Sequence, residues 1–218
     1  MVKNAIKFTP LMDSLPSSVP FVGPETQERL RSSKFLARLG ANENVFGPSP
    51  NAIKAMQQES KNIWMYGDPE NHDLKEALAD HHKINKNEII IGEGIDGLLG
   101  YLARMLIKPG DTVVTSNGAY PTFNFHVSGY GGVLHKVPYK SDMEDPDALI
   151  NKAVEVGAKL IYFANPDNPM GTCHSRTVIT KLINSVPDGC LLILDEAYIE
   201  FADKDVAPKL DPSSSKVV

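Results

Sequence analysis

The chain has 218 residues, of which 42% are hydrophobic and 22% charged, so its composition is globular and excludes disorder over most of its length. It contains 22 basic and 27 acidic residues, and the resulting net charge of −5 excludes a general attraction to nucleic acid or to an anionic membrane surface. The length is sufficient to bury a sizeable core.

Segments that would direct the protein to a membrane or out of the cell are not apparent. The longest apolar strings, such as residues 160–164, are far shorter than the roughly 18 residues of a transmembrane helix. The first seven residues, Met-Val-Lys-Asn-Ala-Ile-Lys, lack the apolar centre of a signal peptide. Cys173 and Cys190 form neither a CxxC pair nor a disulfide framework. We therefore expect a reduced, cytoplasmic protein.

The first 40 residues are rich in proline and serine, which predicts an irregular arm over residues 1–40 that also begins a small domain. Residues 41–218 are predicted to form part of a large domain. A helix is expected to start at Ser49-Pro50, because serine can cap a helix and proline suits its first position. A second helix is expected over Asn71–His82, with the spacing of a buried stripe at Leu74, Ala77, Leu78 and His81.

From residue 88 onward, short apolar segments alternate with amphipathic ones. Strands are predicted at residues 88–91, 111–116, 133–137, 159–164 and 191–194. Helices are predicted between them, at residues 95–107, after Pro121, at 146–156 with Asp145 as the cap, and at 175–186. This alternation predicts an α/β fold, a three-layer sandwich whose mostly parallel sheet is covered by helices on both faces. Residues 216–218 are typical of the start of a further strand, so we expect the chain to be incomplete.

The loops that follow the strands carry the chemical signals. In an open parallel sheet, ligands bind beyond the carboxyl ends of the strands. Four predicted strands are followed by a glycine loop, an aromatic residue, a rigid Asn-Pro turn and a carboxylate, in the segments 92–97, 117–121, 165–171 and 195–198. Each segment alone is a weak signal, but all four are expected to meet at one edge of the sheet.

The glycine loop over residues 92–97 suits either a bound phosphate or a plain strand-to-helix turn. It also fits the GxGxxG pattern of NAD-binding domains, but residues 114–119, at the end of the next strand, include no acid to hold a ribose. Residues 191–196 imitate a Walker B strand, yet the chain contains no GxxxxGK[ST] string. A nucleotide-binding α/β domain is therefore the weaker alternative.

The polar and aromatic residues of the other loops admit two interpretations each. Asp195 follows a buried strand, where a carboxylate needs a cation or hydrogen-bond donors; a protonated pyridine nitrogen is one such partner, and a cap or salt bridge is the structural alternative. Tyr198 can donate to an oxygen on the same ring. Asn165 and Asn168 lie in a proline-stiffened turn that either aims an amide or forms an Asx turn. Tyr120 either stacks on a flat ring or packs in the core.

Together these strings resemble the fold-type I aminotransferases that depend on pyridoxal 5′-phosphate (PLP), and most closely the histidinol-phosphate aminotransferase group. The matching strings occur in the family's order over about three quarters of the chain. They are Ala41–Asn44 with Gly47–Pro50, Tyr66–Pro69, Gly92–Leu98, Tyr120-Pro121, Asn165–Gly171, and Asp195–Tyr198 with Glu200-Phe201.

The resemblance implies a role for each matching position. The PLP phosphate would be bound by the backbone around Gly94, Ile95 and Asp96, and Tyr120 would stack on the pyridine ring. Asn168 and Tyr198 would bind the phenolic oxygen of the ring, and Asp195 its nitrogen. Tyr66 would reach the cofactor phosphate of the neighbouring subunit, which implies a homodimer. Asn42 and Glu43 would lie near the substrate, and no metal is implied.

The sequence also departs from the family pattern. Gly97, Gly67 and Met170 stand where the family often has Glu, Pro and Thr, and these differences weaken the substrate assignment. The aldimine lysine of the family follows the strand after the Asp-Glu-Ala-Tyr string. Lys216 begins the strand-like residues 216–218, so we expect the catalytic lysine to lie beyond Val218.

These features predict a transaminase that moves an amino group between an amino donor, histidinol phosphate or a relative of it, and a 2-oxo acid; this chain alone is expected to be inactive. An aromatic aminotransferase or a threonine-phosphate-type decarboxylase on the same scaffold is a related alternative. A non-catalytic fragment that folds with a partner chain is another. His81-His82 is interpreted as a polar helix end, and Cys173-His174 as lacking the residue that would orient a nucleophile pair.

Overall fold

The computed structural model describes residues 6–17, 21–204, 206–207, 214 and 216–218. The chain divides into two compact units, one formed by Phe21–Ile90 and the other by Met1–Pro20 with Ile91–Val218. The division into an arm over residues 1–40 and a large domain over 41–218 remains a prediction. Among the described residues, no helix has the length and apolar character needed to cross a bilayer.

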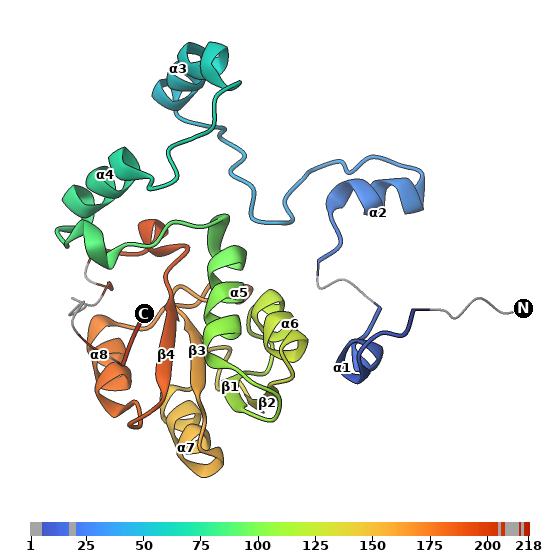
Figure 1. Ribbon diagram of the computed structural model, residues 1–218, viewed down its shortest axis with the longest axis vertical. Coiled ribbons are helices and arrows are strands. Elements are labelled where there is room, and N and C mark those ends of the chain that lie inside the picture. Colours follow the sequence, from blue (N-terminus) through green and yellow to red (C-terminus); the bar gives the residue numbers. More distant parts are fainter. Residues whose placement is uncertain (1–5, 18–20, 205, 208–213, 215) are drawn as a thin grey trace, which may run out of the picture. The chain divides into compact units, whose positions relative to one another are not determined.

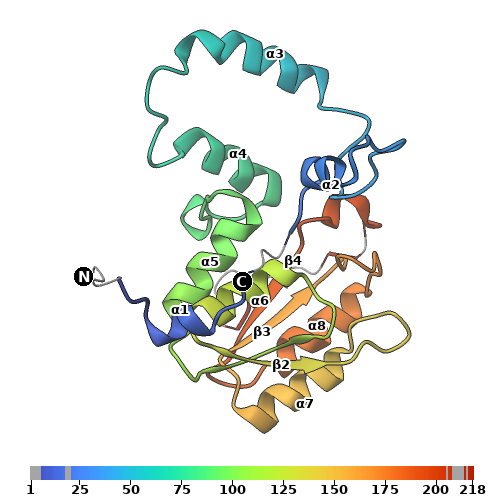
Figure 2. The ribbon, with the colours of Figure 1, turned by 90° about the vertical axis from the view of Figure 1, so that its right-hand side faces the viewer.

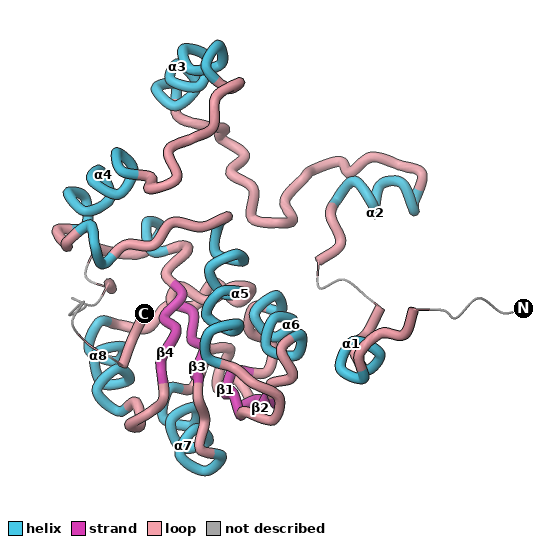
Figure 3. The backbone as a smooth tube through the Cα atoms, in the orientation of Figure 1, coloured by secondary structure: helices cyan, strands magenta, loops and turns pink. Residues whose placement is uncertain are grey.

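The second unit is built on a parallel sheet of four strands, shown in magenta in Figure 3. They are β1 (Thr112–Ser116), β2 (Val133–Val137), β3 (Leu160–Ala164) and β4 (Leu191–Asp195), in the spatial order β2-β1-β3-β4. From β1 the chain moves outward to β2, and from β3 it moves outward in the opposite direction to β4. The carboxyl ends of β1 and β3 therefore flank the topological switch point, where α/β sheets bind ligands.

Helices cover both faces of this sheet (Figure 2), as the sequence predicted. One face packs against α5 (Gly94–Leu106) and α6 (Pro121–Gly129), and the other against α7 (Pro146–Val156) and α8 (Arg176–Ser185). Side chains of β3 alternate between the two cores: Leu160 and Tyr162 join the core under α5 and α6, whereas Ile161 and Phe163 join the core under α7 and α8. All of β3 is buried, as expected for a central parallel strand.

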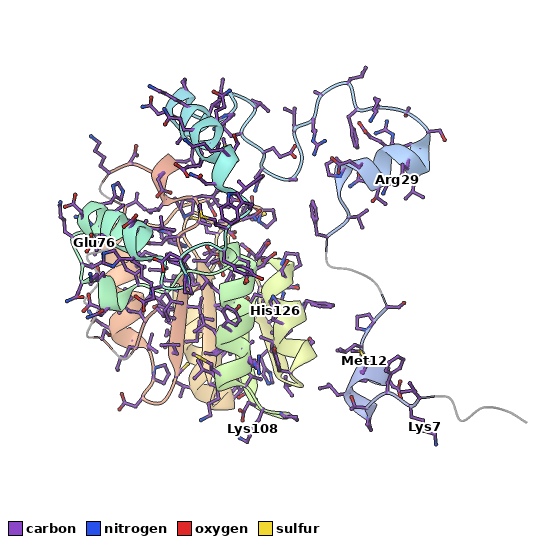
Figure 4. All side chains as sticks on the ribbon, turned by 45° about the horizontal axis from the view of Figure 1, so that its top comes forward. Lys7, Met12, Arg29, Glu76, Lys108 and His126 are labelled. Atoms are coloured by element: carbon purple, nitrogen blue, oxygen red, sulfur yellow. The ribbon has the colours of Figure 1, made fainter. Side chains whose placement is uncertain are left out.

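A small residue allows α5 and α6 to pack closely. A Cβ atom placed on Gly100 of α5 would lie 3.1 Å from Cε1 of His126, which belongs to α6 and is labelled in Figure 4. The contact lets α6 pack directly against α5.

The predicted start of a further strand is observed beside β4, where the C-terminus lies in Figure 1. Val217 forms a parallel bridge with Leu192, and the Leu194 amide donates to the Val218 carbonyl at 2.9 Å.

The unit formed by residues 21–90 is helical and has no core of its own. It contains α2 (Pro24–Arg31), α3 (Pro50–Glu59), α4 (His72–His82) and the 3-10 turns η1 (Ser60–Asn62) and η2 (Lys86–Glu88), and none of residues 21–90 is buried. The helices predicted from Ser49-Pro50 and over residues 71–82 are confirmed. The prediction of a buried stripe on α4 is wrong, since Leu74 is 48% exposed.

Two other predictions are corrected. Residues 1–40 contain two helices, α1 (Pro10–Ser14) and α2, where an irregular arm was expected. In both, proline occupies the start of the helix, where it needs no intrahelical hydrogen bond and so begins the helix rather than breaking it. The strand predicted at residues 88–91 is wrong: Glu88 ends a 3-10 turn and closes a capping box with Asn85, and the extended residue Ile89 that follows belongs to none of the four strands of the sheet.

Candidate functional site

A small pocket lies at the carboxyl edge of the sheet. It encloses about 50 Å³ and draws its lining from the start of α5 and from the loops after β1, β3 and β4. Five of the predicted site residues line it together: Ile95, Tyr120, Asn168, Asp195 and Tyr198. The structure therefore confirms the prediction that these loops meet at one edge of the sheet.

Asp195 is the last residue of β4 and is the buried acid of this pocket, with 8% of its surface exposed. Its Oδ2 accepts a hydrogen bond from Tyr162 Oη at 2.5 Å, and its Oδ1 accepts one from the Ala197 amide at 3.0 Å. Two hydrogen-bond donors on a buried carboxylate offset part of the free-energy cost of removing it from water. The salt-bridge alternative is not observed, since no cationic side chain of the described residues pairs with Asp195.

The two asparagines of the turn after β3 have different surroundings. Asn165 is fully buried, and its side chain pairs with the backbone of His174: Oδ1 accepts from the His174 amide at 2.7 Å, and Nδ2 donates to the His174 carbonyl at 3.2 Å. Asn165 thus ties the turn to the start of α8. Asn168 lies in the wall of the pocket.

Tyr120 and the start of α5 form another wall. The Tyr120 hydroxyl donates to Asp96 Oδ1 at 2.9 Å, which fixes the ring across the pocket, and burial raises the pKa of the hydroxyl. No side chain of the described residues caps the amino end of α5. The Gly94 amide donates to the Gly92 carbonyl at 2.9 Å, and the Ile95 and Asp96 amides that follow suit an outside acceptor. Gly94 has a φ of +69°, a conformation that favours glycine. A Cβ atom on Gly92 would lie 2.8 Å from Leu98 Cδ2, so a larger residue there would displace the Leu98 side chain.

Two buried residues at this edge escaped the sequence analysis. Tyr162 lies in the middle of β3, and its only sequence signal was a hydroxyl within an otherwise apolar strand. Glu144 belongs to the loop after β2, which carries no glycine, aromatic or Asn-Pro signal. The next residue, Asp145, is the predicted cap of α7, and its Oδ1 accepts from the Ala148 amide at 3.1 Å.

Glu144 is instead a buried connection between strands. Its carboxylate accepts a hydrogen bond from Ser116 at the end of β1 and, at 2.9 Å, from the Ala164 amide at the end of β3. Burial raises its pKa to about 7, and the nearby Asp167 and Asp195 act in the same direction. Glu144 therefore keeps its proton to a higher pH than an exposed glutamate and loses it around neutral pH.

Asn42, Glu43 and Tyr66 belong to the other unit. The Glu43 carboxylate pairs with Arg38, whose Nε lies 2.6 Å from Glu43 Oε2, and this pairing lowers the pKa of Glu43. Tyr66 is fully exposed, and Asn42 has a φ of +53°. A larger hollow of about 230 Å³ is lined by residues between Phe21 and Ala41, but it collects none of the chemical motifs except the edge of the Ala41–Asn44 string.

Other candidate groups lie away from the pocket or are not activated. Lys216 Nζ donates to the Val186 carbonyl at 3.0 Å and lies 3.2 Å from Asp188, both of which precede β4 at the opposite edge of the sheet. Burial raises the pKa of Cys173, and its neighbour His174 directs Nε2 to the Glu144 carbonyl at 2.9 Å. Among the described residues, no group of His, Cys, Asp and Glu is arranged to hold a metal ion.

Known proteins resemble this chain over most of its length. A family model described as "Aminotransferase class I and II" matches residues 36–216. A histidinol-phosphate aminotransferase of Moorella thermoacetica is 33% identical over 195 residues, covering 89% of this chain and 50% of the relative. One from Mesorhizobium japonicum is 34% identical over 171 residues, covering 78% and 46%. The chain thus spans about half the length of these curated relatives.

Solved structures agree with these relatives. The crystal structure of histidinol-phosphate aminotransferase from Sinorhizobium meliloti, in complex with pyridoxal 5′-phosphate, superposes with a TM-score of 0.92 at 47% identity, covering 98% of this chain and 58% of that one. An aspartate aminotransferase of Thermus thermophilus has a TM-score of 0.79 at 20% identity, covering 95% and 57%, and shows the shared fold. This chain belongs to the family of class I and II aminotransferases.

Proposed function

We propose that this chain carries the cofactor-binding part of a PLP-dependent aminotransferase. The full reaction would move an amino group from histidinol phosphate, or a related amino donor, to a 2-oxo acid. The observation that carries the proposal is the buried Asp195 carboxylate in a pocket shared with Tyr120, Asn168 and Tyr198. Family membership and relatives named histidinol-phosphate aminotransferase support it.

The donor set of the pocket fits a pyridine ring that bears an oxygen and a phosphate. Asp195 is a buried carboxyl group, which suits a protonated ring nitrogen. Asn168 and Tyr198 offer donors for the ring oxygen, and Tyr120 offers an aromatic face. The uncapped amino end of α5, with the backbone of Gly94, Ile95 and Asp96, suits the phosphate.

When bound, PLP supplies an electron sink for the carbon atoms of the substrate. In this proposal Asp195 would hold a proton on the ring nitrogen, because an adjacent carboxylate favours the cationic form of the ring. Tyr120 would offer its aromatic face to the ring, and its hydrogen bond to Asp96 holds the tyrosine in place. Lys216 is directed to the opposite edge of the sheet, so we assign the lysine that links the cofactor to a position other than Lys216.

Three further elements belong to the proposal. A homodimer would let Tyr66 of one subunit reach the cofactor phosphate of the other; its support is that the unit carrying Tyr66 buries none of its residues. Asn42 and Glu43 would lie near the substrate. A cytoplasmic location is supported by the two free cysteines, Cys173 and Cys190.

The substrate class rests on the names of the relatives. The departures at Gly67, Gly97 and Met170 leave an aromatic aminotransferase or a phosphothreonine-type decarboxylase as the alternatives within the same proposal. Competition between histidinol phosphate, an aromatic amino acid and phosphothreonine for the PLP-loaded protein separates them.

Binding of PLP to the full chain tests the cofactor. The Asp195→Asn variant should bind PLP at least about tenfold more weakly, since loss of a charge-assisted hydrogen bond costs about 1.5–3 kcal/mol. Affinity is measured by titrating the visible absorption band of PLP, with NAD as the competing ligand. Asp188→Asn makes the same chemical change at an exposed position and should leave the affinity unchanged. Equal binding by Asp195→Asn and the parent would contradict the proposal.

A further inference from the structure

We propose that Tyr162 is a positioning residue for Asp195: its hydroxyl holds the carboxylate in the orientation and charge state that the ring nitrogen of the cofactor requires. The inference rests on the proposed function and adds to it a residue that does not line the pocket. It follows from a hydrogen bond between neighbouring strands, from the packing of the tyrosine ring and from its burial.

The register of the sheet brings the two side chains together. Ala164 of β3 lies opposite Asp195 of β4, and Tyr162 lies opposite Ile193. Tyr162, Ala164 and Ile193 share the core under α5 and α6, and Asp195, two residues after Ile193, projects to the same side. Tyr162 is thus the diagonal neighbour of Asp195, and its long side chain spans the distance, with Oη 2.5 Å from Oδ2.

The ring of Tyr162 cannot easily move away from this bond. It is fully buried and stacks on Phe123, with ring centroids 4.7 Å apart and an interplanar angle of 17°. Phe123 lies in the first turn of α6, two residues after Pro121. The same helix start therefore supports both the pocket wall at Tyr120 and the tyrosine behind Asp195.

The hydroxyl remains a donor throughout the accessible pH range. Burial and the negative charge of Asp195 raise the pKa of Tyr162. Other groups act on the pair from neighbouring elements: Glu144 from the loop after β2, Tyr120 from the start of α6, and Glu196 next to Asp195. Tyr162 and the Ala197 amide both donate to the carboxylate, so loss of Tyr162 Oη removes one of these two donors.

The test is PLP binding by the full chain and by Tyr162→Phe, across a range of pH. We expect affinity about tenfold lower for the variant, a loss that grows as the pH falls, because a carboxylate with fewer donors gives up its charge more readily. The spectrum of bound PLP should shift toward that of the unprotonated ring. Tyr130→Phe is the matched control, because Tyr130 caps the opposite end of α6.

A double-variant comparison separates positioning from packing. In the Asp195→Asn background, Tyr162→Phe should change neither the affinity nor its pH profile further. Equal binding by Tyr162→Phe and the parent overturns the inference, and so does a loss that is independent of pH and persists in the Asp195→Asn background.

Two further outcomes have definite meanings. If Tyr162→Phe does not fold, Phe123→Leu keeps the hydroxyl but loosens the ring; a smaller loss with the same pH trend supports the inference, and an unchanged profile overturns it. If the parent binds no PLP, the proposed function fails and the inference fails with it. A parent that binds while Tyr162→Phe behaves identically overturns the inference alone.

Discussion

Glu144 shows how one side chain can join two strands at the edge that forms the pocket. Its carboxyl group contacts Ser116 from β1 and the Ala164 amide from β3, the two strands that flank the switch point. His174 contacts its backbone carbonyl, and Asp167 and Asp195 lie near enough to oppose its ionisation. The residue therefore makes the stability of this edge depend on pH.

The pH dependence has a definite sign. The pKa of Glu144 rises from 4.5 to about 7 on folding, so the folded protein binds this proton more tightly than the unfolded chain. Its contribution to the free energy of unfolding is complete below about pH 4.5 and is lost as the pH rises to about 7, by at most about 3 kcal/mol. Glu144→Gln should flatten this decline, as measured by urea unfolding at about pH 5 and about pH 8.

Glu196 provides the comparison for this experiment. Burial raises its pKa to about 7 as well, so a part of the decline should remain in Glu144→Gln. The double variant Glu144→Gln, Glu196→Gln should be flatter still. An unchanged decline in Glu144→Gln would show that Glu144 is already ionised in the folded protein.

Helix α7 shows how local signals place an element under the sheet. Asp145 caps its amino end, Pro146 follows at the first helical position, and Gly157 ends it with a φ of +62°. The Ala158 amide returns to the Ala153 carbonyl at 2.9 Å, which closes the last turn. Between these ends, Leu149 and Ala153 enter the core beneath β1, β2 and β3.

Loss of the Asp145 cap should destabilise α7 without disturbing the pocket. Asp145→Ala leaves the Ala148 amide without its side-chain acceptor and should lower the free energy of unfolding by about 1 kcal/mol. Asp145→Asn retains an oxygen acceptor and should lose much less. Chemical denaturation measures both variants, and equal losses would attribute the effect to the charge at the helix end instead of the cap.

At the scale of the whole molecule, the two units differ in what they bury. The unit built on the sheet has two cores, whereas no residue of 21–90 is buried, although this stretch includes Phe46, Ile63, Trp64 and Tyr66. A helical segment with apolar side chains and no core requires another surface to cover it. The proposed homodimer supplies such a surface.

Mixed dimers test whether Tyr66 acts across subunits. Tyr66→Phe and Asp195→Asn should each weaken PLP binding when every subunit carries the change. After the two variants are mixed and allowed to exchange, each hybrid dimer should regain one site with parental affinity, because one subunit retains Asp195 and its partner retains Tyr66. Titration of the PLP absorption band counts the regained sites, and sedimentation equilibrium establishes the dimer. No regained sites in verified hybrids would place Tyr66 outside the partner's site.

The sequence predicted the sheet well, for a physical reason. Strands such as Leu160–Ala164 are short apolar runs bounded by turns, and helices such as α7 carry their own caps. Two predictions failed because a residue type has more than one local role. The prolines of α1 and α2 begin helices, where an irregular arm was expected. Glu88 closes a capping box with Asn85 in a 3-10 turn, where the start of a strand was expected. The apolar residues of α4 have the spacing of a buried stripe, but they remain unburied because the unit of residues 21–90 has no core.

By itself, the sequence determined the alternation of elements and the order of the motifs, because hydrophobic period, caps and glycine positions are local properties of the chain. It therefore predicted that Tyr120, Asn168, Asp195 and Tyr198 would share one edge. Only the tertiary structure decided that Tyr162, 33 residues before Asp195, is its partner, and that Glu144 is buried between β1 and β3. These contacts depend on strand register and burial, which arise only when distant segments pack together.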